Sequence, residues 1–221
     1  MTYYKATRTD GTSFYDSKTK WTVGRITRPP NPNTSKGLCS SGVLHISDAP
    51  GETLAGGSWP CRLFEVEPRS ALISGYAHKH GCTAVKVVRE LPAWQALGPN
   101  GEAVAAHIEQ CKTITPEQAR QLADARTTWT VNRPAARTAA WDAAAGDAAR
   151  TAALACVRNA IAARNAIAAQ DAAWPAASAA WPAALALVVR DLITPEQFDR
   201  LYGPWASVMD STRLHQEKGE K

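Results

Sequence analysis

The chain has 221 residues, which is enough for one large domain or two small ones. Its hydrophobic fraction of 45% and charged fraction of 20% are typical of a globular protein, and its formal net charge of +5 is compatible with an anionic partner. No apolar run approaches the roughly 18 residues of a membrane span, and no secretory signal is visible in the polar start MTYYKATRTDG, so we expect neither a membrane nor a secreted protein.

Five cysteines lie far apart in the chain, at Cys39, Cys61, Cys82, Cys111 and Cys156. Their odd number and wide spacing do not resemble a disulfide framework. We therefore expect free thiols in a reducing cytoplasm.

The first ninety residues contain short β-type runs separated by turn residues. TYYKATR (2–8) and TSFYD (12–16) flank Asp10-Gly11, a pair typical of hairpin turns. KWTVGRIT (20–27) predicts an edge strand, and the proline-rich stretch 28–37 predicts a loop.

Three further strands are predicted in GVLHIS (42–47), CRLFEVE (61–67) and TAVKVVREL (83–91). In the first, alternation places Leu44 and Ile46 in the core, and Ser40-Ser41-Gly42 forms the turn that precedes it. DAPGETLAGG (48–57) predicts one or two helical turns between strands.

The signal becomes helical after about residue 92. Short helices are predicted at 92–98 and 101–111, and longer ones at 115–129 and 194–205. Both longer segments open with Thr-Pro-Glu-Gln, in which the threonine is expected to cap the helix and the proline to occupy its first position.

Residues 135–187 are alanine at about half of their positions, which predicts helix. Ile167, Trp174, Trp181 and Val188 are spaced by seven and form one stripe, which favours either an oligomer interface or packing within the chain. Because proline disrupts helix interiors, Pro175 and Pro182 predict that the segment is two or three helices that restart at each Trp-Pro.

These patterns together predict an α+β fold, with a small mixed or antiparallel sheet domain followed by an α-helical, alanine-rich half. The expected divisions are an α+β domain at 1–92, short connecting helices at 93–134, an Ala/Trp-rich helical region at 135–210 and a disordered tail at 211–221.

The N-terminal part resembles an uncharacterised domain family that recurs in phage and actinobacterial proteins. The resemblance rests on Tyr4-Lys5-Ala6, CSSGVLHISDAPGETL (39–54) and RLFEVEP (62–68), and several members also carry an Ala/Trp-rich tail. It covers roughly residues 3–92 and implies a small α+β domain in a phage, prophage or actinobacterial setting. It implies no established activity.

One candidate site combines His45 and Ser47 with Glu65 and Glu67. Alternation places each pair on one face of its strand, so all four could meet on the polar side of one sheet. With Lys5 or Arg8 on the first strand, the order is similar to that of ADP-ribosyltransferases, in which a carboxylate stabilises an oxocarbenium-like centre of NAD. The alternative is a solvated sheet face or a non-catalytic ligand site.

A second candidate is HKHGC, in which His78, His80 and Cys82 alternate in the sequence. An extended chain would point all three side chains the same way, as zinc ligands require. No Cys-x-x-Cys or His-x-x-x-His pair supports a metal site, so a polar loop is the favoured interpretation and zinc the alternative.

Basic and aromatic residues of the first third suggest an anionic ligand. The candidate binding residues are Lys5, Arg8, Trp21, Arg25, His45 and Ser47. We therefore expect a non-enzymatic binding protein for a nucleotide, nucleic acid or host protein, which could form homo-oligomers through the Ala/Trp helices. The alternatives are an NAD-using ADP-ribosyltransferase-like enzyme and a purely structural protein.

Overall fold

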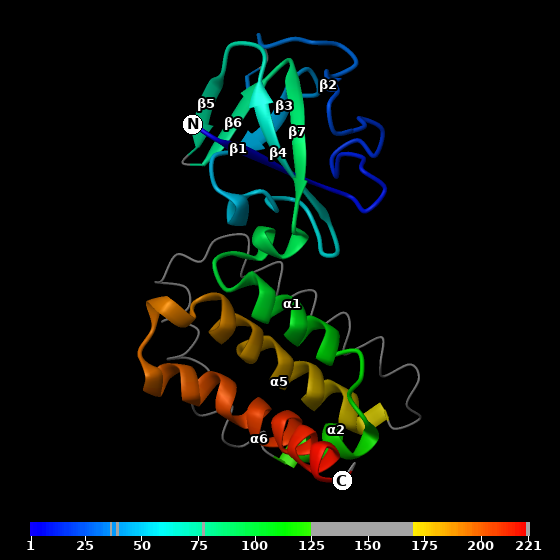
Figure 1. Cartoon of the computed structure of the whole chain (residues 1–221), viewed down its shortest axis with the longest axis vertical. Helices are drawn as coiled ribbons and strands as arrows, with labels where there is room; N and C mark the ends of the chain where they lie inside the picture. The colour runs from blue at the N-terminus through cyan, green and yellow to red at the C-terminus, as the bar shows by residue number, and fades with distance from the viewer. Residues whose placement is uncertain (36, 39, 77, 125–169, 220–221) are drawn as a thin grey trace. The chain divides into compact units, whose positions relative to one another are not determined.

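The computed structural model describes residues 1–35, 37, 38, 40–76, 78–124 and 170–219 (Figure 1). The chain forms two compact units that divide after Gly101. We call residues 1–101 the sheet unit and the described residues from 102 onward the helical unit. The predicted α+β fold class is confirmed.

The sheet unit contains one seven-stranded antiparallel sheet in the order β2-β7-β4-β1-β3-β6-β5. Its strands are β1 (Tyr3–Thr7), β2 (Ile26–Thr27), β3 (Leu44–Ser47), β4 (Arg62–Pro68), β5 (Ile73–Tyr76), β6 (Lys79–Cys82) and β7 (Val85–Leu91). Two short 3₁₀ helices, η1 (Pro50–Glu52) and η2 (Ala93–Leu97), belong to the same unit.

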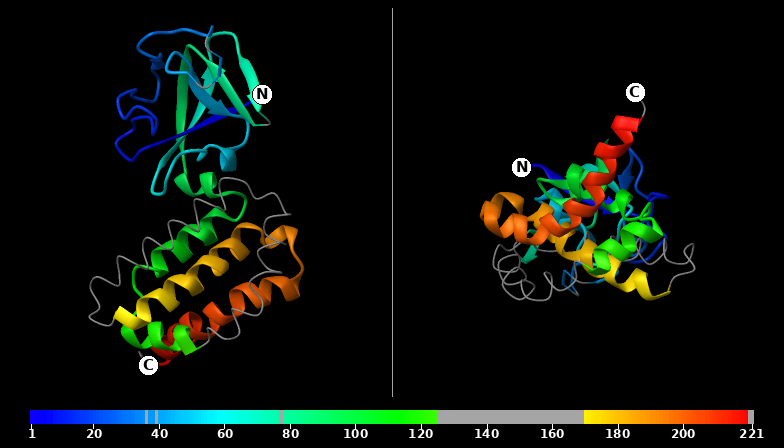
Figure 2. Two further views of the ribbon diagram at one scale, coloured as in Figure 1. Left: turned by 180° about the vertical axis from the view of Figure 1, so that it is seen from behind. Right: turned by 90° about the horizontal axis from the view of Figure 1, so that it is seen from below.

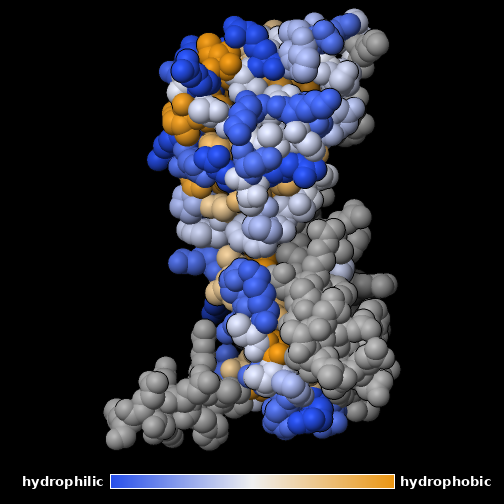
Figure 3. Space-filling view, turned by 90° about the vertical axis from the view of Figure 1, so that its right-hand side faces the viewer, coloured by the Kyte–Doolittle hydropathy of each residue, from blue (hydrophilic) through white to orange (hydrophobic). Residues whose placement is uncertain are grey.

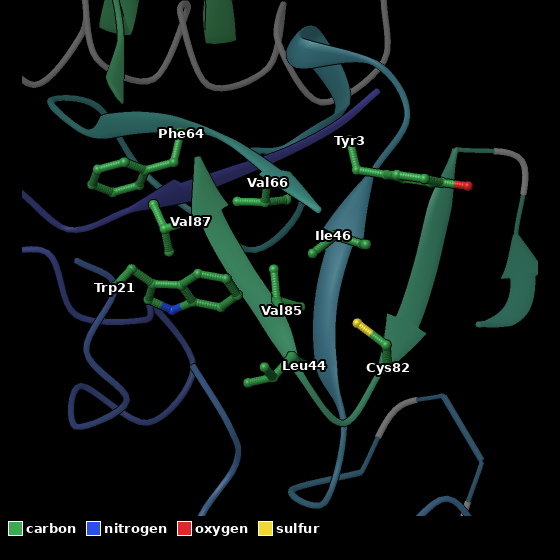
Figure 4. Packing of buried hydrophobic residues seen from close by; sticks show 9 residues of the cluster. All are labelled: Tyr3, Trp21, Leu44, Ile46, Phe64, Val66, Cys82, Val85 and Val87. Atoms are coloured by element: carbon green, nitrogen blue, oxygen red, sulfur yellow. The ribbon is translucent and has the colours of Figure 1, made fainter. Parts of the chain in front are cut away.

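The core of the sheet unit lies against one face of the sheet. Figure 4 shows Trp21 from a loop packing beside Val85 and Val87, with Ile46 and Tyr3 further along the same face. Leu44 and Ile46 are buried, as their alternation predicts. On the side drawn in Figure 3, the outer surface of this unit is mostly hydrophilic, with a few hydrophobic residues among the polar ones.

The hairpin predicted around Asp10-Gly11 forms only its turn. Gly11 has a φ of 82°, and the Asp10 carboxylate accepts hydrogen bonds from the backbone N–H and hydroxyl of Thr12. Residues 12–16 were predicted to be a strand, and this prediction was wrong: the chain turns again, because Asp16 accepts hydrogen bonds from Lys18 and Thr19.

The predicted edge strand 20–27 shortens to β2, which does lie at the edge of the sheet. At the opposite edge, β5 and β6 form a hairpin that the sequence did not predict. Their segment is short and contains Gly75 and Gly81, two residues that weaken a strand pattern. Gly81 has a structural reason to lack a side chain, because a Cβ there would come within 2.5 Å of Leu38 and Val43 side-chain atoms.

The helical unit contains α1 (Gly101–Gln110), α2 (Pro116–Asp124), α5 (Gln170–Val188), the 3₁₀ helix η3 (Arg190–Leu192) and α6 (Pro195–Gly219). The left view in Figure 2 shows α5 between α1 and α6. None of the helices in the described part of the chain is long and apolar enough to cross a membrane. Helix α6 continues into residues 211–219, which the sequence pattern had placed in a disordered tail.

Both Thr-Pro-Glu-Gln segments begin helices, as predicted. The Gln118 and Gln197 side-chain amides accept hydrogen bonds from the backbone N–H groups of Thr115 and Thr194 at 2.9 Å. In return, the two threonine hydroxyls accept bonds from the backbone N–H groups of the same glutamines. These are reciprocal capping boxes, which satisfy N–H groups that a helix start leaves without partners.

The Trp-Pro pairs do not restart helices, contrary to the prediction, because α5 runs unbroken through Pro175 and Pro182. Its alanines explain this tolerance. Ala180, Ala183 and Ala184 are buried, and such small side chains allow close packing of neighbouring helices, which offsets the hydrogen bonds lost at proline. Of the predicted stripe, Val188 is buried and Trp181 is half-buried, while Ile167 lies outside the described residues.

Replacing Pro204 with alanine is expected to stabilise the helical unit by about 1–3 kcal/mol. Pro204 lies inside α6, where proline removes one helical hydrogen bond and crowds the preceding turn. The matched control is Pro195→Ala, since Pro195 occupies the start of the same helix, where its missing N–H has no helical partner. Urea unfolding monitored by hydrogen exchange in α6 measures both. Equal effects of the two substitutions would contradict this explanation.

Candidate functional site

A pocket of about 430 Å³ opens beside β1 and β3. The two strands pair only at Tyr4 and Ser47, whereas β1 pairs with β4 from Tyr3 to Thr7. Residues from β1, β3 and β6 line the pocket, together with residues 14, 15, 40, 52, 53, 55 and 56. Its volume is within the range of small-molecule sites, roughly 300–1,000 Å³.

Three basic side chains line this β1–β3 pocket, namely Lys5, His45 and Lys79. The pKa of Lys5 is lowered to about 8, chiefly by burial and next by the positive charge of Lys79, while Asp16 opposes the shift. Burial also lowers the pKa of His45, with Lys79 and Lys5 adding to the effect. The imidazole is therefore neutral at pH 7, while Lys5 keeps most of its positive charge.

The tautomer of His45 follows from its hydrogen bond. Its Nε2 lies 2.5 Å from the carbonyl oxygen of Leu38. Because a carbonyl can only accept, Nε2 carries the proton and the lone pair is on Nδ1.

The remaining lining combines hydroxyl groups and aromatic rings with one acidic residue, Glu52. The hydroxyl groups belong to Ser40, Ser47 and Thr53, and the rings to Tyr4, Phe14 and Tyr15. The Ser47 oxygen accepts a bond from the backbone N–H of Ala49 at 3.2 Å, so its own proton is available to donate elsewhere. Tyr15 lines the pocket and is 77% exposed, so much of its ring is open to solvent.

Glu65 and Glu67 do not meet His45 and Ser47, contrary to the predicted arrangement. Strand β1 lies between β3 and β4, and Tyr4 stands opposite both Ser47 and Glu65. Ser47 and Glu65 are therefore two strand spacings apart, about 10 Å. Glu65 accepts a hydrogen bond from Arg89 at 2.7 Å, and Glu67 accepts one from Arg69 at 2.8 Å.

The histidines of HKHGC bind an aspartate. Nδ1 of His78 and Nε2 of His80 lie 2.7 Å and 3.1 Å from the two carboxylate oxygens of Asp48. Cys82 belongs to the buried core, and His78 lies in the turn before β6. The three side chains therefore do not converge on one point, as they would if the whole segment were extended. Within the described ranges, no group of three or more His, Cys, Asp or Glu side chains could hold a metal ion.

The bonds to the two histidines affect the titration of Asp48. Burial alone would raise its pKa, but the bonds from His80 and His78 outweigh burial and hold the pKa below its ordinary value. A carboxyl whose pKa is lowered by folding stabilises the protein above its unfolded pKa. This contribution is lost as the pH falls through the folded value, which lies below 3.8.

The other predicted ligand residues lie elsewhere. Trp21 is buried in the core, and its Nε1 donates to Ser13 Oγ at 2.8 Å, so its ring is not open for stacking. Arg8 and Arg25 are exposed and do not line the β1–β3 pocket. Of the six predicted ligand residues, the pocket brings together Lys5, His45 and Ser47.

Lys79 and the three rings were not recognised in the sequence. Lys79 was not considered as a ligand-binding residue because its two neighbours, His78 and His80, suggested metal binding instead. Tyr15 and Phe14 lie in a segment predicted to be a strand, where large rings usually indicate a core face. Only knowledge that this segment turns back toward β3 would have placed them in a pocket.

The described cysteines are poor nucleophiles. Cys61, Cys82 and Cys111 are buried. Burial raises the pKa of Cys61 to about 12 and that of Cys82 to about 11, so both remain protonated thiols at neutral pH.

The segments that carry the family resemblance form the centre of this unit. Residues 40–54 supply β3 and η1, and residues 62–68 supply β4. Comparisons with known protein families, curated proteins and solved structures found no match to this chain.

Proposed function

We propose that the protein binds a small anionic ligand with a planar ring, such as a nucleotide, in the β1–β3 pocket. The observation that carries this proposal is the presence of two lysines, hydroxyl donors and aromatic rings around one cavity of about 430 Å³. A non-enzymatic binding role is consistent with this proposal, and a phage or mobile element is the setting that the family resemblance implies.

The electrostatics of Lys5 and Lys79 favour an anion between them. Each positive charge raises the free energy of the other, and the lowered pKa of Lys5 reflects this repulsion in addition to burial. A phosphate or carboxylate in the pocket would replace the repulsion with two attractions. Charge-assisted hydrogen bonds of this kind contribute roughly 1.5–3 kcal/mol each.

The aromatic lining favours a flat group on the same ligand. An exposed tyrosine at the rim of a pocket offers one open ring face, and base–aromatic stacking contributes about 1–3 kcal/mol per base. Ring and anion together are the recognition chemistry of a nucleotide.

Lys79→Met is expected to lower the affinity for adenosine 5′-monophosphate about tenfold or more, because one charge-assisted contact to phosphate is lost. Titration calorimetry at two salt concentrations measures the change, and the wild-type affinity should fall with salt. Lys20→Met is the matched control, since Lys20 is exposed in the same unit and does not line the pocket. Equal losses in both variants, or no binding by the wild-type protein, would contradict the proposal.

The ADP-ribosyltransferase-like alternative makes a different prediction. It requires nicotinamide release from NAD that collapses when Glu65 and Glu67 are both replaced by glutamine. Since neither glutamate lines the β1–β3 pocket, binding of adenosine 5′-monophosphate should survive this double substitution. Turnover of NAD by the wild-type protein and its loss in the double variant would replace the proposed binding role with catalysis.

A further inference from the structure

We propose that Lys5 forms a reversible imine with an anionic aldehyde or ketone in the β1–β3 pocket. The inference rests on the proposed function, because the same pocket would hold the anionic part of the ligand. It adds a covalent step and a substrate class, namely carbonyl compounds that carry a phosphate or carboxylate.

The surroundings of the Lys5 amine support this chemistry. The amine lies over the indole of Trp21, with Nζ 5.3 Å from the ring centroid. Among the described residues of the sheet unit, none forms a hydrogen bond or salt bridge with it. The charge of Asp16 raises the pKa of the amine, but burial and Lys79 lower it by more. Lys5 also lines the pocket, whose volume of about 430 Å³ provides room for a ligand carbonyl.

The protonation state is also suitable. With a pKa of about 8, roughly a tenth of the amine is neutral at pH 7, whereas an ordinary exposed lysine is almost wholly protonated. Only the neutral amine is nucleophilic, and burial beside a second cation is the means by which proteins activate lysine. A second lysine at the same pocket, Lys79, supplies that cation.

The reaction is balanced without an oxidant or reductant. The lone pair of Nζ attacks the carbonyl carbon, and the C–N bond forms as the carbonyl oxygen takes up a proton. The carbinolamine then loses its hydroxyl as water, after which nitrogen and carbon share a double bond. In total, the two protons of the neutral amine leave with the carbonyl oxygen as one molecule of water, and hydrolysis reverses the step.

The experiment uses two matched probes on the full chain. Pyridoxine 5′-phosphate has a ring and a phosphate but no aldehyde, so titration calorimetry with it measures reversible binding alone. Pyridoxal 5′-phosphate adds the aldehyde, and cyanoborohydride converts any imine into a stable secondary amine that peptide mass spectrometry assigns to one lysine.

At equimolar probe, we expect one adduct per chain, located at Lys5, with a labelling rate that is half-maximal near pH 8. Lys5→Arg keeps the positive charge and should abolish this adduct, while Lys20→Arg should leave it unchanged. Circular dichroism checks that both variants are folded.

Two failures are distinguishable. If pyridoxine 5′-phosphate binds but the label spreads over exposed lysines, the imine is overturned and the binding function stands. If the probe does not bind and Lys5 is not labelled, the proposed function and the imine both fail. Labelling of Lys5 at a rate that does not change between pH 7 and 9 would also overturn the inference, since the neutral fraction of the amine must rise across that range.

Discussion

Trp21→Ala is expected to destabilise the sheet unit by about 3–5 kcal/mol, a large part of the stability of a domain of this size. The indole is almost completely buried against β7 in the core cluster of the sheet (Figure 4). Its removal leaves a cavity that the surrounding strands can fill only in part. It also removes the hydrogen bond from Nε1 to Ser13 and the ring that lies under Lys5.

The measurement is urea-dependent hydrogen exchange, followed separately in peptides from the strands and from the helices. Protection should fall in the strands, and the helical unit serves as an internal reference. The matched control is Tyr15→Ala, which removes an aromatic ring from the same unit at a site that is mostly exposed, so its effect should stay within about 0.5 kcal/mol. Equal destabilisation by both variants would contradict the role assigned to Trp21.

Trp205→Ala should have a similar effect, about 3–5 kcal/mol, confined to the helical unit. Trp205 is completely buried in α6, and its ring meets the ring of His107 from α1 edge-on, with centroids 4.4 Å apart. It therefore joins two helices that are far apart in the sequence. Leu192→Ala is the control, since Leu192 is exposed in the same unit and should change the stability little.

Phenylalanine at the same two positions separates packing from hydrogen bonding. Nε1 of Trp205 is buried and has no hydrogen-bond partner among the described residues, whereas Nε1 of Trp21 donates to Ser13. Trp205→Phe removes an unsatisfied donor, which recovers roughly 1–3 kcal/mol of stability. This gain offsets much of the packing that is lost with the smaller ring. Trp21→Phe loses a satisfied bond. We therefore expect Trp205→Phe to be the milder change, and the reverse order would show that the Trp205 donor has a partner.

Local chemistry made the helical half the more predictable part of the fold. The two Thr-Pro-Glu-Gln segments form capping boxes within four residues, so no distant contact is needed to place the helix starts. The prolines of α5 were misleading for the opposite reason. Their cost is local and visible in the sequence, but the packing of Ala180 and Ala183 that outweighs it comes from other helices.

The site was predicted in part, and strand order is the reason. Alternation correctly paired His45 with Ser47 on β3 and Glu65 with Glu67 on β4, but it cannot show which strand lies between them. The sheet places β1 there, which brings Lys5 to the pocket and removes the glutamates from it. Lys79 lines the pocket because β6 pairs with β3. The sequence did not predict the β5–β6 hairpin, because its glycines weaken the strand pattern.

The central position of β1 has a consequence for synthesis on the ribosome. Both neighbours of this first strand, β3 and β4, come later in the chain, and β2 acquires its partner only with β7, at Val85–Leu91. The nascent chain must therefore hold β1 without its second neighbour until β4 has emerged, at Arg62–Pro68, and β2 without a partner until β7 has emerged. Such non-local pairing slows folding, so the sheet unit is exposed to chaperones and to aggregation for longer than a chain of successive hairpins would be.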